Sequence, residues 1–163
     1  TSDAHMPEVP HYRECPPRPR ANGNPLSFFR LFEERKALGH VWTEEGWEPG
    51  RPHYARWMRF LEPPKTQDGL LDVLAFPPIL DMMPGAVVQA VPKDERLFLA
   101  PSLDLTVHFY RSTACEWLLL YARCRDAADG LASAEIELWD ENGVLLAYAT
   151  QVMMLRKFKK RGA

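Results

Sequence analysis

The chain has 163 residues, a formal net charge of −2 at pH 7 and 46% hydrophobic residues. This length suits one domain with a full-sized core, and the near-neutral charge argues against general binding to nucleic acids or membrane surfaces. No apolar run approaches the roughly 20 residues of a membrane-spanning helix, and no signal peptide is visible. The three cysteines lack metal-ligand spacing, which favours a reducing, intracellular compartment, most simply the cytoplasm.

The first 26 residues are rich in proline and have little apolar periodicity. We predict a proline-rich linker or arm over residues 1–26, a globular domain over residues 27–158 and a basic tail over residues 159–163. The chain does not begin with methionine, so we expect the arm to continue a preceding segment. His5, His11 and Cys15 lie in this arm without a fourth ligand, which favours a solvated tail over a metal site.

Two strands and a buried helix are predicted next. Residues 31–38 and 55–61 favour strands, and residues 68–91 are apolar nearly all round, as in a buried helix with Asp68 as its N-cap. Pro77-Pro78 should interrupt this helix because proline lacks a backbone donor and clashes with the preceding turn. We expect a second helical segment with Pro78 in its first turn, which would place Asp81 close to a helix N-terminus.

The last third of the chain changes to a period of two. Residues 103–109, 116–125, 131–140 and 144–155 predict consecutive antiparallel strands, and Asn142-Gly143 is a hairpin signal before the last one. A buried helix followed by such a meander predicts an α+β fold with the sheet wrapped on the helix.

One glutamine interrupts the apolar face of the last predicted strand. Alternation places Gln151 on one face with Leu145, Ala147, Ala149, Met153 and Leu155. A buried amide is costly without hydrogen-bond partners. Gln151 is therefore either a structural amide bonded to neighbouring backbone or part of a site.

Several short motifs of this chain share their order and spacing with one family: MPEVP at 6–10, LDMM at 80–83, SLD at 102–104, HFYR at 108–111, EWLL at 116–119, DENGVL at 140–145 and ATQ at 149–151. Together they resemble the C-terminal half of the type II acyl-CoA thioesterases. The chain departs from the family at Leu105, where relatives usually carry histidine. It ends in Arg161-Gly162-Ala163, which differs from the peroxisomal tripeptide of some relatives.

This resemblance implies a hotdog fold, a curved antiparallel sheet around a central helix, for residues 27–158. It implies a catalytic group of Asp81, Ser102 and Gln151 that activates water to hydrolyse a fatty acyl-CoA or carrier-bound thioester. No cofactor or metal is implied, since CoA is part of the substrate. Family members carry two hotdogs with the site between them, so the partner would be a second copy or another hotdog.

Each proposed site residue has a structural alternative. Asp81 could simply cap a helix, and Ser102, directly after Pro101, could satisfy a strand end or turn. Strict alternation also places Ser102 on the polar face of its strand, unless a bulge at Pro101 redirects it. The alternative function is a non-catalytic hotdog that binds acyl groups or assembles with a partner hotdog.

Overall fold

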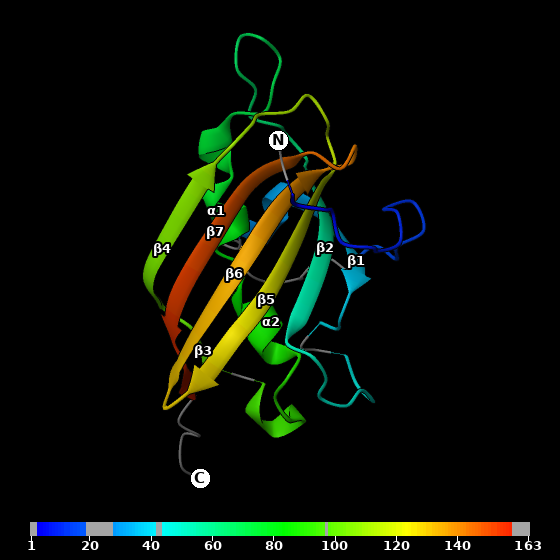
Figure 1. The fold of residues 1–163 in the computed structure, drawn as a ribbon. Helices are drawn as coiled ribbons and strands as arrows, with labels where there is room; N and C mark the ends of the chain where they lie inside the picture. Colours follow the sequence, from blue (N-terminus) through cyan, green and yellow to red (C-terminus); the bar gives the residue numbers. More distant parts are fainter. Residues whose placement is uncertain (1–2, 19–27, 42–43, 97, 158–163) are drawn as a thin grey trace.

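The computed structural model describes residues 3–18, 28–41, 44–96 and 98–157. Within these residues, one face of a six-stranded antiparallel sheet is covered by the short helices α1 (Pro77–Leu80) and α2 (Pro84–Val88), as Figure 1 shows. The strand order is β1-β2-β5-β6-β7-β4, with bounds Phe32–Leu38, His53–Phe60, Leu118–Ala128, Leu131–Asp140, Leu145–Met154 and Ser102–Phe109. The expected α+β hotdog architecture is confirmed. None of the helices in these residues is long and apolar enough to cross a membrane.

The remaining elements are small. β3 (Phe98–Leu99) pairs with β8 (Arg156–Lys157) in a separate two-stranded sheet. Short 3-10 helices span Phe28–Leu31, Val73–Ala75 and Lys93–Glu95.

The central helix is more broken than the sequence predicts. The break at Pro77-Pro78 is confirmed, because both prolines open α1, but Pro84 then restarts the chain once more as the first residue of α2. The predicted N-cap at Asp68 is wrong. Asp72 takes that role, its Oδ1 accepting the backbone N–H of Leu74 at 2.9 Å, because the first helical turn begins only at Val73.

The main core lies between the helices and the sheet. Phe76, Ile79, Leu80 and Met83 are fully buried against the inward side chains of the strands. On β6 the predicted inward set is confirmed, with Ala132, Ala134, Ile136 and Leu138 all in this core. The contact between the helices and the sheet therefore decides which side chains of each strand point inward.

The hairpin between β6 and β7 shows the predicted turn and one correction. Gly143 adopts a positive φ of 77°, and the carboxylate of Asp140 accepts the N–H groups of Asn142 and Val144, both at 3.0 Å. Leu145 pairs with Trp139, but Ala147 pairs with Leu138, so the register shifts by one residue. Because of this bulge Leu146 enters the main core and Leu145 turns to the other face, contrary to the simple alternation.

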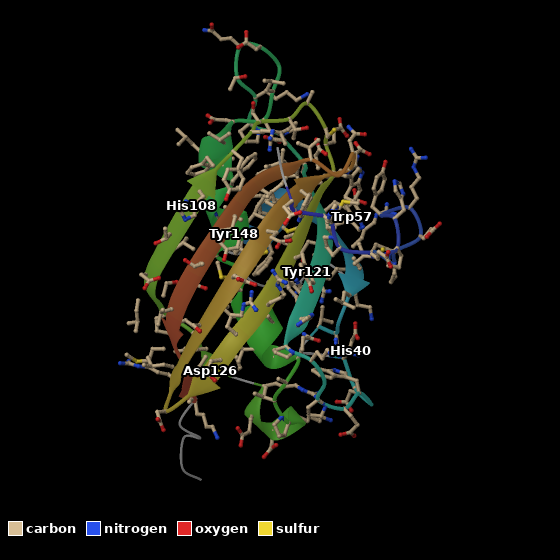
Figure 2. All side chains as sticks on the ribbon, viewed as in Figure 1. His40, Trp57, His108, Tyr121, Asp126 and Tyr148 are labelled. Atoms are coloured by element: carbon tan, nitrogen blue, oxygen red, sulfur yellow. The ribbon has the colours of Figure 1, made fainter. Side chains whose placement is uncertain are left out.

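A second apolar cluster lies on the outer face of the sheet, which faces the viewer in Figure 2, where Trp57 and Tyr121 are labelled. Tyr12 and Cys15 of the N-terminal segment are buried there, against Trp57 and Trp117. The Tyr12 and Trp117 rings stack at 4.7 Å, and Trp57 Nε1 donates to the backbone oxygen of Pro10 at 2.9 Å. Residues 3–18 thus pack on the sheet. Residues 1–2 and 19–26 of the predicted arm and the predicted basic tail lie outside the described residues.

Candidate active site

Three polar side chains from separate elements meet at one end of α1. Ser102 Oγ donates to Asp81 Oδ1 at 3.0 Å. Gln151 Nε2 donates to Ser102 Oγ at 2.6 Å and also to Asp81 Oδ1. The structure therefore brings together all three residues that the sequence singles out, as one hydrogen-bonded group.

Each residue reaches this point through a different local feature. Asp81 is the C-terminal cap of α1 and lies two residues before Met83, the N-cap of α2, so the helix N-terminus close to it is that of α2 and not the one at Pro77-Pro78. The Asp81 carboxylate itself makes no hydrogen bond to the end of either helix among the described residues. The alternative that this side chain serves only to cap a helix therefore has no support. Gln151 lies in the middle of β7 with its side chain 1% exposed, and its amide bonds to side chains instead of neighbouring backbone.

A β-bulge directs Ser102 toward the group. On β4, Asp104 pairs with Val152 and Leu105 with Gln151, whereas Ser102 pairs with Met153, so the register shifts between Ser102 and Asp104. Met153 and Gln151 both belong to the inward face of β7. The extra residue therefore moves Ser102 from the outer to the inward face. The sequence predicts a bulge at Pro101 that would redirect Ser102, and the structure has this bulge slightly later, between Ser102 and Asp104.

Two acceptor atoms of the group remain free. Both hydrogen bonds to Asp81 fall on Oδ1, so Oδ2 has no partner among the described residues, and Asp81 itself is exposed. Gln151 Oε1 is buried and also lacks a hydrogen-bond partner in the described part of the chain. A buried acceptor of this kind normally has a partner. Ser102 and Gln151 therefore hold the Asp81 carboxylate by two hydrogen bonds. Asp81 Oδ2 and Gln151 Oε1 can then accept hydrogen bonds from a polar molecule such as water.

A cavity of about 420 Å³ opens beside Asp81. Its wall is largely apolar, with Phe28, Phe29, Met82, Val88 and Phe98, and it also contains arginine side chains from three parts of the described chain: Arg18, Arg56 and Arg96. Such a volume is typical of a pocket for part of a small ligand. Asp81 thus lies where a bound molecule would meet both an apolar wall and a carboxylate.

The sequence match to known domains is extensive. Residues 12–155 match the acyl-CoA thioesterase C-terminal domain. The chain belongs to this family. A comparison with proteins of curated function finds no match.

Solved structures show the same fold as this acyl-CoA thioesterase domain. A suspected thioesterase from Novosphingobium aromaticivorans superposes with a TM-score of 0.73 at 26% identity, over 96% of this chain and 56% of that one. An acyl-CoA thioesterase II, TesB2, from Mycobacterium marinum gives 0.73 at 20% identity, over 98% and 58%. The domain therefore spans a little over half of the length of these two relatives. The protein smu.793 from Streptococcus mutans, solved bound to acetyl CoA, gives 0.57 at 16% identity, over 75% and 100%.

One buried residue of the site region escapes the sequence reasoning. Arg56 lies on β2 between Tyr54 and Met58 in the alternation, so it shares their inward face, and it is 0% exposed. The strand predicted over residues 55–61 already contains Arg56, and an arginine on the same face as core residues is unusual. The alternation of residues 53–60 could therefore have identified it.

The described residues contain no cluster of three or more His, Cys, Asp or Glu side chains suited to a metal ion. Cys15, one of the conceivable ligands in the N-terminal segment, is buried, and its Sγ donates to the backbone oxygen of Pro10 at 3.4 Å. This cysteine has a packing role in the outer cluster.

Proposed function

We propose that this domain hydrolyses acyl-CoA thioesters by direct attack of water, with Asp81 as general base. The observation that carries the proposal is the fixed carboxylate. Ser102 and Gln151 both donate to Oδ1, which leaves Oδ2 of an exposed carboxylate free beside a cavity. A base must lie within hydrogen-bond reach of the proton that it removes, and Oδ2 is free to accept a hydrogen bond from water.

The reaction balances without any further reagent. Water oxygen bonds to the thioester carbon while Oδ2 of Asp81 takes one proton from the water. The tetrahedral intermediate then breaks its carbon–sulfur bond, and the sulfur leaves with the proton from Asp81. The products are a carboxylic acid and the free thiol of CoA. CoA enters as part of the substrate, and we propose no cofactor.

The family supports this substrate class. The matched domain is named for acyl-CoA thioesterases, and the fold is shared with a type II acyl-CoA thioesterase and with a protein solved bound to acetyl CoA. The largely apolar cavity wall beside Asp81 suits an acyl chain.

The direct test is thiol release from acyl-CoAs of several chain lengths. We expect hydrolysis by the purified protein in an assembled state, with a rate that depends on acyl length because the cavity has a limited volume. Complete absence of hydrolysis with every acyl length in the assembled protein would contradict the proposal. It would favour a hotdog that only binds acyl groups.

We further propose that a second hotdog pairs with the edge strand β4. This strand ends the sheet, pairing only with β7 among the described strands, and it carries Ser102 of the candidate site. Leu103 and Phe109 on it are 55% and 44% exposed. An exposed edge strand is a template for pairing with another chain. Such pairing would cover the site and complete its cleft.

Phe109→Lys should weaken self-association of the isolated domain. A charge on this edge would have to be desolvated on pairing, which opposes contact with a second sheet. Sedimentation equilibrium measures the change, and we expect a shift from dimer to the 18.7 kDa monomer. Leu131→Lys is a matched control, since Leu131 is equally exposed at 44% but lies at the start of β6. Equal association of both variants and the unmodified domain would place the interface elsewhere.

A further inference from the structure

One charged side chain in the cavity wall lacks the partners that a buried charge needs. Arg56 is 0% exposed, and its Nη1 donates to the backbone oxygens of Leu38 and Ala55, both at 2.8 Å. Its Nε and Nη2 atoms have no hydrogen-bond partner among the described residues. Unsatisfied donors on a buried charged group are strongly unfavourable. A partner from outside the chain would therefore be stabilising here.

The acidic groups around Arg56 are already engaged. Glu34 pairs with Arg18 at 2.7 Å, and Glu44 pairs with Lys36 at 3.0 Å. Burial lowers the pKa of the Arg56 guanidinium; Tyr54 opposes this most, Arg18 adds to it, and Glu34 and Glu44 oppose it less. The Arg56 guanidinium lies over the Tyr54 ring, 4.2 Å from its centroid, but no carboxylate pairs with it among the described residues.

The cavity as a whole carries an excess of positive charge. Of the described residues that line it, Asp81 is the one acid, and because Arg18 is neutralised by its pair with Glu34, Arg56 and Arg96 carry the excess. Arg96 is 6% exposed and donates to the backbone oxygens of Val91 and Trp47, at 3.3 and 3.1 Å, without an ion pair among the described residues. A cavity with this wall favours a ligand that carries negative charge.

We propose that this cavity binds an anionic oxygen group of the substrate, with Arg56 as its main donor. The inference rests on the proposed function, since Asp81 and Arg56 line the same cavity. A guanidinium offers donors in a fork that matches a carboxylate or a phosphate. The group comes either from the far end of the acyl chain, as in an ω-carboxyacyl thioester, or from the phosphates of CoA.

Equilibrium binding separates these two sources and does not depend on turnover. The probes are hexanoyl-CoA, adipoyl-CoA and hexanoyl-pantetheine, titrated calorimetrically into the Asp81→Asn protein so that none is consumed. Adipoyl-CoA differs from hexanoyl-CoA by a terminal carboxylate, and hexanoyl-pantetheine lacks the CoA phosphates. Arg56→Met in the same background removes the proposed donor. Arg56→Lys keeps the charge but not the fork, and serves if the Met variant does not fold.

Either of two results supports the proposal. If the acyl end supplies the anion, adipoyl-CoA binds roughly 10- to 100-fold more tightly than hexanoyl-CoA, and Arg56→Met removes this preference. If the phosphates of CoA supply the anion, Arg56→Met lowers the affinity for both CoA thioesters by a similar factor and leaves the affinity for hexanoyl-pantetheine unchanged.

Arg59→Met is the matched control. Arg59 lies on the same strand but pairs with Glu33 and Glu116, at 2.7 and 3.5 Å, outside the cavity wall. We expect the Arg59→Met protein to bind all three probes with the same affinities as the parent protein. Identical affinities for all three probes in the parent and in both Arg56 variants would overturn the proposal. A protein that binds the probes as expected but hydrolyses no thioester would contradict only the proposed catalysis.

Discussion

Asp81→Asn should lower kcat/KM for acyl-CoA hydrolysis by roughly 100- to 10,000-fold, the usual contribution of a positioned general base. Asparagine keeps an Oδ1 acceptor for Ser102 and Gln151, so the three-residue group can persist. It cannot take a proton from water. Thiol release measures the rate, and an unchanged thermal midpoint would show that the loss is chemical. Asp126→Asn is the matched control, because Asp126 is an exposed carboxylate on β5, labelled at the lower end of the sheet in Figure 2.

Gln151 and Ser102 should act through Asp81 instead of independently. Gln151→Ala removes a donor to Oδ1 and also a donor to Ser102, so we expect a loss of activity on its own. Residues that act as a unit are strongly non-additive. The double variant Asp81→Asn with Gln151→Ala should therefore be scarcely slower than Asp81→Asn alone. Hydrolysis at the parent rate by both single variants would place the site elsewhere.

Trp57→Ala should lower the free energy of unfolding by about 3 to 5 kcal/mol, the usual range for truncating a buried tryptophan. Trp57 is 1% exposed at the centre of the outer cluster. Truncation would leave a cavity between the sheet and the N-terminal segment. It would also remove the Nε1 donor to Pro10, at 2.9 Å. Denaturant unfolding followed by far-UV circular dichroism measures the change.

Two further variants separate the contributions at Trp57. Trp57→Phe keeps most of the ring but loses the hydrogen bond to Pro10, so a smaller loss is expected. Leu74→Ala changes a side chain that is 75% exposed and should stay within about 0.5 kcal/mol of the parent. A Trp57→Ala protein as stable as the Leu74→Ala protein would show that the outer cluster contributes little.

Short-range patterns were sufficient to predict most of the sheet. The bounds predicted for residues 131–140 match β6, and the turn at Gly143 follows from Asn142-Gly143. Period-two alternation also identified Gln151 as a polar residue on the inward face. These features depend on neighbours in sequence, which is why a single sequence reveals them.

The errors arose where tertiary contacts decide the structure. The apolar run from residue 68 favoured a longer helix, but Pro77, Pro78 and Pro84 leave only short turns that the core holds in place. The face of the sheet on which Leu145 lies depends on a β-bulge opposite Trp139, which alternation along one strand cannot reveal. The packing of Tyr12 on Trp117 joins residues over a hundred positions apart, so a proline-rich segment gave little sign of it.

The bulge between Ser102 and Asp104 makes the site depend on strand register at one point of the sheet edge. Regular pairing of the same residues would set Leu103 opposite Met153 and Ser102 opposite Met154, which would turn the Ser102 hydroxyl to the outer face and away from Asp81. Leu103 is therefore the extra residue of the bulge, and it is 55% exposed. A change that flattens this bulge would leave the sheet intact and take the serine out of the site.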